Sequence, residues 1–381
     1  MKLLIAQPYL SLRGGVDRVI LKIAERYNAP IYTLEYNKKE AFPEFAKLDV
    51  RIVGKDVPLS KMLPYRASQG LRYGYNFYNL EVKEDYDVIN AHISPSEWIR
   101  HKNERVLWYC HTPPREVYDL YKARMGNRTY REKIIYMSMT RAYKTIAGRI
   151  IRKIEKIVTN SDNTRKRISK YFGVNSTVIS PGIDYERFGN ESDGRFFFYP
   201  SRIVPNKRQD YVISAFKRFR ASYDKGGRYR LILAGALSED PEHMRYYQRL
   251  LKLAKGSNVT IRTNVNDSAL RKLYSNSTAV LTAAVNEDFG IVPLEAMASW
   301  KPVVSVNEGG HRESIIEGKT GFLVNSPIEM ASSMRFLVEH KDSAERMGRA
   351  GRKRVVQEYS WNSFFHKFDR AAREVMKNKE Y

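Results

Sequence analysis

The sequence predicts an α/β protein built from two doubly wound parallel sheets of the Rossmann-like type. Short β-prone runs alternate with helical segments along the whole chain, which is the pattern of parallel sheets with helices on both faces. The chain has 381 residues, 43% of them hydrophobic, and this length exceeds one ordinary core. We therefore predict domains at residues 1–188 and 189–360, followed by a helix at 361–381 that packs back towards the first domain.

The first half of the chain contains five predicted strands and two predicted helices. The opening strand, residues 3–6, is followed by Gly14-Gly15 and a helix at about residues 16–27. A second helix begins after Ser161, which is a good N-cap residue. The other strands are the β-prone runs at residues 88–91, 105–109, 156–159 and 177–180.

The second half repeats the pattern after a predicted linker, formed by residues 181–184 and the polar stretch 189–194. Its predicted strands are the runs at residues 196–199, 230–234, 259–261, 279–282 and 302–305. The strand at 230–234 leads into Gly235-Ala236-Leu237-Ser238 and then a long polar stretch.

The strand-to-helix turn at residues 287–295 is the most informative segment. Pro293 suits the first turn of the helix, because the N–H that proline lacks would be unsatisfied there anyway. Glu287 in the loop and Glu295, expected in the first turn, are placed to hold two ends of one ligand. Isolated carboxylates at such positions are more often helix caps, so the pair gains weight only from its surroundings.

The backbone before Pro293 predicts a site for a phosphate or a polar sugar. The N–H groups of Phe289, Gly290, Ile291 and Val292 lie where a helix begins, with the positive end of its dipole behind them.

Candidate ligand-binding residues follow the predicted strands in both halves. Ligands bind at the carboxyl ends of parallel strands, so these groups are expected at one edge of each sheet. They are Gly14-Gly15, His111, Arg202 with Lys207, Glu287, and Gly309-Gly310.

Composition limits the class of protein. Cys110 is the single cysteine, which excludes an intrachain disulfide framework and a cysteine-based zinc site. The chain has no apolar run of about 18 residues, so no transmembrane helix is predicted. The apolar start at residues 3–6 is too short for a signal peptide, and the cytosol is the expected compartment.

The formal net charge is +24, and residues 115–170 hold 16 Lys/Arg against 5 Asp/Glu. Tyrosine, methionine and isoleucine are interspersed among these cations between residues 130 and 144. The mixture suits a surface that meets anionic lipid headgroups, but it also suits nucleic acid binding or a merely solvated face.

Taken in order, these features resemble the retaining, sugar-nucleotide-dependent glycosyltransferases of family 4, which have the GT-B fold. The similarity covers nearly the whole chain. It rests on the motifs Gly14-Gly15, Asn160-Ser161 with Thr164, residues 178–184, Ser201-Arg202 with Lys207, Glu287 with Glu295, and Gly309-Gly310 with Glu313, Gly318 and residues 321–324. The resemblance implies two domains facing a central cleft, with the acceptor on the first and the donor on the second.

The resemblance also implies residue roles. Arg202 and Lys207 would stabilise the leaving diphosphate, Glu287 would contact the transferred sugar, and Glu295 would hold the ribose. His111 would lie beside the donor sugar, while Gly14, Gly15 and the backbone of residues 289–292 would cradle the donor. No metal or other cofactor is implied, because cationic side chains and helix dipoles replace it. We see no convincing carboxylate nucleophile, which favours same-face attack for retention.

The segment Trp108-Tyr109-Cys110-His111-Thr112-Pro113-Pro114-Arg115 narrows the expectation, since it resembles mannosyltransferases of polysaccharide and lipid-linked oligosaccharide assembly, many of which use GDP-mannose. A cytoplasmic, membrane-associated mannosyltransferase with a lipid-linked glycan acceptor is therefore the first hypothesis. The alternatives are a UDP-sugar-dependent glucosyl- or N-acetylglucosaminyltransferase, a soluble glucan or trehalose-type synthase, a nucleotide-sugar epimerase, and a basic nucleic-acid-binding protein. No nucleic-acid-binding module is recognised, so no nucleic acid partner is expected.

Overall fold

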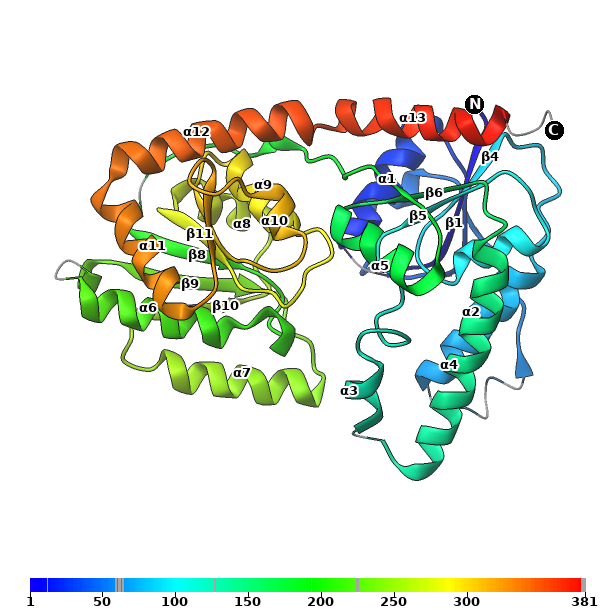
Figure 1. Cartoon of the computed structure of the whole chain (residues 1–381), viewed down its shortest axis with the longest axis horizontal. Coiled ribbons are helices and arrows are strands. Elements are labelled where there is room, and N and C mark those ends of the chain that lie inside the picture. The colour runs from blue at the N-terminus through cyan, green and yellow to red at the C-terminus, as the bar shows by residue number, and fades with distance from the viewer. Residues whose placement is uncertain are drawn as a thin grey trace. The chain divides into compact units, whose positions relative to one another are not determined.

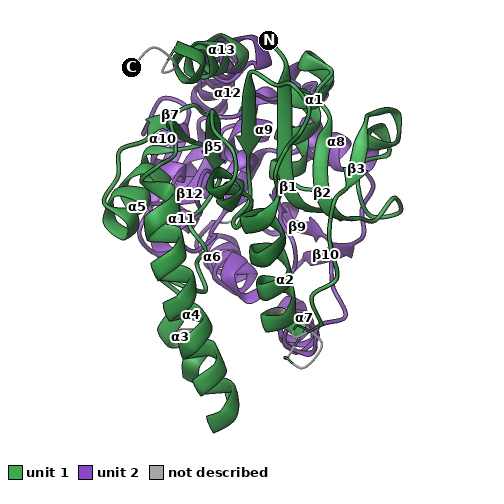
Figure 2. Cartoon of the chain, turned by 90° about the vertical axis from the view of Figure 1, so that its right-hand side faces the viewer, with its two compact units in different colours: residues 1–180, 365–381 green, residues 181–364 purple. Residues whose placement is uncertain are grey.

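A computed structural model describes residues 1–377, except for residues 12, 59, 61, 62, 64, 127, 193, 224 and 225. The chain forms two compact units, coloured separately in Figure 2. Unit 1 consists of residues 1–180 together with the end of the chain from Phe365, and unit 2 runs from Pro181 to Phe364.

Unit 1 is built on a seven-stranded sheet in which every adjacent pair is parallel. The register places Ile5 beside Ile31 on one side and Asn90 on the other. The strands in spatial order are β3 (Val50–Ile52), β2 (Ile31–Tyr36), β1 (Leu3–Leu10), β4 (Val88–Ala91), β5 (Val106–Cys110), β6 (Lys156–Thr159) and β7 (Thr177–Val178).

Helices connect the strands of unit 1 and cover the sheet (Figure 1). Helix α4 is the longest of them, and it begins with a capping box formed by Thr129 and Glu132. The helical elements are α1 (Gly15–Tyr27), η1 (Pro43–Lys47), α2 (Tyr65–Asn79), η3 (Ser96–His101), α3 (Tyr121–Gly126), α4 (Tyr130–Ile151) and α5 (Asp162–Phe172).

Unit 2 contains a six-stranded parallel sheet flanked by helices. Its strands in spatial order are β10 (Val259–Thr263), β9 (Arg230–Gly235), β8 (Phe196–Pro200), β11 (Ala279–Thr282), β12 (Val303–Val306) and β13 (Gly321–Val324). Its helical elements are η4 (Tyr185–Arg187), η5 (Pro205–Lys207), α6 (Gln209–Ser222), η6 (Gly226–Arg228), α7 (Pro241–Ala254), α8 (Asp267–Asn276), α9 (Ile291–Ala298), α10 (His311–Ser314), α11 (Pro327–Glu339) and α12 (Lys341–Glu358).

Strand β8 shows why these sheets need helices on both faces. Phe197 and Tyr199 pack into one hydrophobic cluster, and Phe196 and Phe198 pack into another. Successive side chains of a strand point to opposite faces, so a run of four aromatic residues fills both cores at once.

Helix α13 (Trp361–Lys377) carries the chain from unit 2 back into unit 1. Phe368 in the middle of the helix and Val375 near its end lie in the interior, with 0% and 1% of their surfaces exposed. The Tyr27 hydroxyl donates a hydrogen bond to Asp369, and the Lys156 ammonium lies 2.5 Å from a carboxylate oxygen of Glu374. Residues 378–381 of the predicted helix, and Asp193 of the predicted linker, lie outside the described residues.

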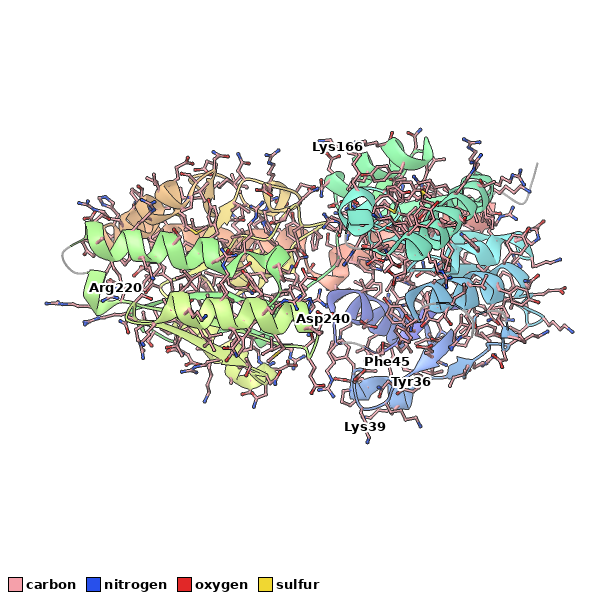
Figure 3. The ribbon with its side chains drawn as sticks, turned by 90° about the horizontal axis from the view of Figure 1, so that it is seen from below. Tyr36, Lys39, Phe45, Lys166, Arg220 and Asp240 are labelled. Atoms are coloured by element: carbon pink, nitrogen blue, oxygen red, sulfur yellow. The ribbon has the colours of Figure 1, made fainter. Side chains whose placement is uncertain are left out.

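The structure confirms all the predicted strands and adds three. The additional strands are β2, β3 and β13. Sequence reasoning missed them because β2 mixes polar and apolar residues, β3 has only three residues, and β13 begins with a glycine, which strands disfavour. The polar stretch after Gly235 was assigned no element from the sequence. It contains helix α7, which is capped by Asp240 (labelled in Figure 3) and begins with Pro241.

Candidate functional site

In unit 2, three candidate loops follow adjacent strands at one edge of the sheet. Strands β8, β11 and β12 are neighbours, and their carboxyl ends lead into the loops that carry Lys207, Glu287 and Gly309. The Lys207 ammonium lies 2.5 Å from Oε2 of Glu287. Both side chains are partly exposed, at 17% and 29%, so this pair remains accessible to a polar ligand.

Helix α9 corrects the position predicted for Glu295. The helix begins at Ile291, two residues before Pro293, so Glu295 is its fifth residue and no acidic residue lies in the first turn. Pro293 is still within the first turn, as expected. The Tyr274 hydroxyl donates a 2.6 Å hydrogen bond to Oε2 of Glu295, which fixes the carboxylate from the neighbouring helix α8.

The turn before α9 requires glycine because the backbone is closely packed there. Gly290 has φ of 81°, in the left-handed region, and a Cβ there would lie 2.5 Å from the His311 ring. A Cβ on Gly310 would lie 2.6 Å from the carbonyl oxygen of Phe289. The Gly310 N–H donates to the carbonyl of Glu287 at 2.8 Å, which joins the two loops directly.

The predicted backbone cradle at residues 289–292 spans the start of α9, and the first N–H groups of a helix have no partner within it. The Phe289 side chain is 8% exposed and packs beside Tyr359 in the core, so this residue offers a ligand only its backbone. Ile291 and Val292 are partly exposed at the helix start.

The cations near this turn differ in their surroundings. Arg202 follows β8 and is exposed, whereas Lys207 is paired with Glu287. Sequence reasoning missed the ion pair between Arg208 and Glu308, whose closest atoms are 2.8 Å apart. A carboxylate oxygen of Glu308 also accepts a hydrogen bond from the Asn286 N–H, so one side chain connects the loops after β8, β11 and β12. The position of Glu308 before Gly309-Gly310 was the available signal.

His311 lies beside Gly290 at the same edge of the sheet. From the sequence, its role was left open between a contact with the sugar and a helix cap. The ring is 1% exposed, and burial lowers its pKa to about 4. Its Nδ1 lies 2.9 Å from the hydroxyl of Ser305, which itself donates to the carbonyl of Val306. In this arrangement Nδ1 carries the proton, and Nε2 is an acceptor beside Gly290.

In unit 1 the predicted residues also follow adjacent strands. Gly14 is the N-cap of α1, after β1, while His111 comes directly after β5. Strand β4 lies between them and ends at Ala91, and His92 follows it directly. Nothing lies within 4 Å of a Cβ placed on Gly15, so this position is open. Asp17 in the first turn of α1 is 3% exposed, and burial raises the pKa of its carboxyl to about 6.

A buried hydrogen-bond chain determines which nitrogen of His111 carries its proton. Asn90 donates from Nδ2 to the carbonyl of Leu107 at 3.1 Å, so its Oδ1 accepts from Nε2 of His92 at 2.8 Å. His92 Nδ1 is then the acceptor for Nε2 of His111 at 3.0 Å. His111 therefore presents Nδ1 as a hydrogen-bond acceptor, which suits a sugar hydroxyl.

The His92 and His111 rings are both neutral at physiological pH. Burial lowers the pKa of His111 to about 3 and that of His92 well below its usual value. No role for His92 was predicted, because only the pairing of β4 with β5 in the sheet brings its ring beside that of His111.

Unit 1 also contains a polar cavity of about 610 Å³ beyond the carboxyl ends of β1 and β2, which sequence reasoning missed. Figure 3 labels Tyr36, at the end of β2, and Lys39 in the turn that follows. Aromatic faces together with carboxylate and amide groups are suited to a sugar. The lining residues are Tyr9, Ser11, Glu35, Tyr36, Asn37, Glu40, Tyr65, Gln69 and Tyr73.

Two further findings concern partners of the chain. None of the described helices is long and apolar enough to cross a membrane. Among the residues that the structure describes, no group of three His, Cys, Asp or Glu side chains is arranged to hold a metal ion. That the clusters of the two units face one cleft stays a prediction.

Two family models match successive parts of the chain. The model for Glycosyltransferase Family 4 matches residues 13–187, and the model for Glycosyl transferases group 1 matches residues 184–354. Together they span both described units.

Among curated proteins, the alpha-1,3/1,6-mannosyltransferase ALG2 of Homo sapiens is 28% identical over 392 residues, which cover 92% of this chain and 91% of that protein. The trehalose synthase of Thermococcus litoralis is 29% identical over 179 residues, covering only 46% of this chain and 43% of that protein.

Solved structures share the whole fold at low identity. The sucrose-phosphate synthase of Thermosynechococcus elongatus has a TM-score of 0.77 at 16% identity, covering 100% of both chains. Anabaena HepE in complex with UDP and glucose has a TM-score of 0.72 at 16% identity, covering 97% of this chain and 98% of that one.

Proposed function

This chain belongs to the family-4 glycosyltransferases of GT-B fold, and from that premise we propose that it transfers mannose from a nucleotide sugar to a lipid-linked glycan with retention of configuration. The observation that carries the proposal is the Lys207–Glu287 pair beside the start of α9, where cation, carboxylate and helix N–H groups meet.

The proposed roles follow from charge. A nucleoside diphosphate gains negative charge as the glycosidic bond breaks, and Arg202 and Lys207 supply positive charge to stabilise it without a metal. The start of α9 contributes its dipole and its N–H groups to the same phosphates. Glu295, oriented by Tyr274, would accept hydrogen bonds from the ribose hydroxyls. Glu287 would accept hydrogen bonds from the hydroxyls of the transferred sugar.

The remaining roles concern the reacting sugar. Nδ1 of His111 would accept a hydrogen bond from a sugar hydroxyl, since the neutral ring offers a lone pair there. Same-face attack would let an oxygen of the departing phosphate take the proton of the acceptor hydroxyl, so the protein need not supply a nucleophile.

Mannose is our first choice of donor sugar, because similarity to a mannosyltransferase extends over 92% of the chain. A UDP-glucose-dependent reaction is the second candidate. It is favoured by partial similarity to trehalose synthase and to a probable sucrose-phosphate synthase of Thermosipho melanesiensis, which is 31% identical over 48% of this chain.

A thermal-shift panel of GDP-mannose, UDP-glucose and UDP-N-acetylglucosamine tests the donor, because a ligand that binds only the native state raises its stability. We expect the largest shift and the fastest release of nucleoside diphosphate with GDP-mannose, in the presence of EDTA as well as magnesium. If the protein turns over only a UDP-sugar, the proposed donor is wrong but the proposed enzyme class stands. No stabilisation by any nucleotide sugar would overturn the proposal.

We also propose that the protein binds anionic membranes through helix α4. Tyr130, Ile134 and Met137 are 79%, 45% and 44% exposed, and their spacing places them on one face of the helix. Arg141 is exposed one turn further along the same face. An apolar stripe beside cations fits the boundary between acyl chains and headgroups.

Liposome sedimentation tests membrane binding. Replacing Ile134 and Met137 by glutamate should release the protein from anionic vesicles, and so should joint neutralisation of Arg128, Arg131, Lys133, Arg141 and Lys144. Ile328→Glu is the matched control, since Ile328 is 61% exposed on α11 in unit 2. If the wild-type protein does not bind anionic vesicles even at low salt, the proposed membrane binding is wrong.

A further inference from the structure

The described part of unit 1 contains an apolar cavity of about 500 Å³ between helices α2 and α4, apart from the polar cavity beside β1 and β2. The two helices pack against each other and lie side by side in Figure 1. The volume falls within the range of small-molecule pockets, which is about 300–1,000 Å³. Its walls include Gly70, Leu71, Trp98, Ile135, Met139 and Ile146.

Glycines on α2 create this space. A Cβ on Gly74 would lie 2.7 Å from the Trp98 ring, so the absence of a side chain lets the indole lie against the helix. A Cβ on Gly70 would meet only the terminal methyl of Met139, at 3.7 Å. Glycine within a helix costs roughly 1 kcal/mol relative to alanine, so two glycines here are unfavourable for the helix alone.

Helix α2 separates this cavity from the polar one. Tyr65, Gln69 and Tyr73 recur every four residues and line the polar cavity. Gly70, Gly74 and Tyr78 have the same spacing and line the apolar cavity. These sets lie on different faces of one helix, so α2 stands between the two cavities.

Two carboxylates and one arginine line the apolar cavity. Both carboxylates have partners within the chain, since Glu116 pairs with Arg124 at 3.4 Å and Glu132 accepts from the Thr129 N–H and hydroxyl. Arg128 donates to the carbonyl of Arg124 and lies over the Tyr136 ring, 4.3 Å from its centre. Both contacts are with uncharged groups, although the carboxylate of Glu132 is near enough to offset part of the charge. Arg128 is therefore the lining residue that can donate to a phosphate.

We propose that the α2–α4 cavity binds the hydrocarbon chain of a phosphate-bearing lipid, with Arg128 at the phosphate. The inference rests on the proposed function only in identifying this lipid with the acceptor, because the cavity and its charge are properties of unit 1 itself. It deepens that function by giving the acceptor's lipid part its own site.

The test uses dodecyl phosphate brominated on its chain, at concentrations where it is monomeric. Bromine quenches tryptophan fluorescence on contact, and Trp98 lines the cavity. We expect saturable quenching that Trp98→Phe abolishes. The octyl analogue should bind about a hundredfold more weakly, because two buried methylenes are worth roughly tenfold in affinity.

Gly70→Leu fills the cavity while improving helix propensity, so loss of folding is not the expected effect. Gly148→Leu is the matched control, because Gly148 lies in α4, does not line the cavity, and has nothing within 4 Å of an added Cβ. Gly70→Leu should weaken binding roughly tenfold or more, and Gly148→Leu should leave it unchanged. Arg128→Gln should weaken dodecyl phosphate but not dodecanol.

The outcomes separate this inference from the proposed function. If Gly70→Leu is still quenched, the cavity is not the lipid site, and this result does not depend on the enzymatic activity. Absence of quenching together with normal release of nucleoside diphosphate from the donor overturns the inference alone. Saturable quenching without release overturns the proposed function and leaves a lipid site. A wild-type dimer that Gly70→Leu converts to a monomer would show that a second copy fills the cavity.

Discussion

Lys207 and Arg202 are the residues on which donor chemistry most depends. Replacing either by alanine should lower kcat/KM about a hundredfold, the scale of one lost electrostatic contact to a transition state. Arg218→Ala removes the same charge from the exposed face of α6 and is the control. Steady-state kinetics with the preferred donor provide the measurement, and wild-type values in Lys207→Ala would exclude that residue from the site.

Substitutions of Glu287 and Glu295 should have different effects, because the two carboxylates are assigned to different parts of the donor. Glu295→Ala should weaken binding of the free nucleoside diphosphate, measured by calorimetry, and Tyr274→Phe should do so less, since it only removes the hydroxyl that holds Oε2. Glu287→Ala should keep that binding within a few fold and reduce turnover. The opposite pattern would mean that the two carboxylates exchange roles.

His92 acts on His111 through the proton that they share. His92→Phe removes the acceptor for Nε2–H of His111, so both tautomers of His111 become accessible and kcat should fall about tenfold or more. His92→Asn retains an acceptor oxygen near Nδ1 and should restore much of the loss. Nitrogen chemical shifts of the His111 ring report the tautomer directly, and unchanged shifts in His92→Phe would contradict the chain of hydrogen bonds.

Glu97 makes stability depend on pH. It is fully buried, and burial raises the pKa of its carboxyl from 4.5 to about 7. The folded state therefore binds a proton that the unfolded state releases, and stability falls as pH rises from about 4.5 through 7. Glu97→Gln should gain up to about 3 kcal/mol over wild type across this window, measured by denaturant unfolding at several pH values. A constant difference would mean that Glu97 is charged in the fold.

At the scale of elements, the start of α9 depends on the turn at Gly290. Gly290→Ala forces a Cβ into the His311 ring at φ of 81°, and we expect at least about tenfold weaker nucleotide binding. Gly318→Ala is the matched control, since Gly318 has φ of 68° with nothing within 4 Å of its Cβ. Both variants should lose roughly 1 kcal/mol of stability from backbone strain, and Gly290→Ala should lose more because of the clash with the His311 ring. Equal nucleotide affinity in the two variants would show that the turn does not shape the site.

The sequence predicted the existence of the turn before α9 but not the residue at which the helix begins. The β-prone run at 279–282 and Pro293 located the turn correctly, because local propensity determines both. The start of the helix was placed too late, since Gly290 adopts a left-handed conformation that lets Ile291 begin it. The Arg208–Glu308 pair and the His92–His111 contact join residues 100 and 19 positions apart, and no local pattern reports such pairs.

For the whole molecule, the two-sheet architecture followed from the alternation of strands and helices, and the structure confirms it. The polar cavity and the α2–α4 cavity could not be predicted, because α2 contributes to both linings and its two faces become distinct only when β1, β2 and α4 pack around it.

The end of α13 should be essential to one unit only. Removing the chain from Phe365 onward takes buried Phe368 and Val375 out of unit 1, where losing one buried phenylalanine alone costs about 3–5 kcal/mol. We expect calorimetry to show unit 1 unfolding at a much lower temperature, with unit 2 still stabilised by nucleotide. A single unchanged transition would show that the end of α13 adds little to the fold.

The discontinuity of unit 1 sets an order for folding during synthesis. Residues 181–364 form one uninterrupted segment, so unit 2 can fold as soon as that segment has left the ribosome. The nascent unit 1, although translated first, must wait for Phe368 and Val375 before its core is complete. Until then its unfinished surface is exposed to chaperones and proteases, so slow or interrupted translation near the last helix should reduce the yield of unit 1 before that of unit 2.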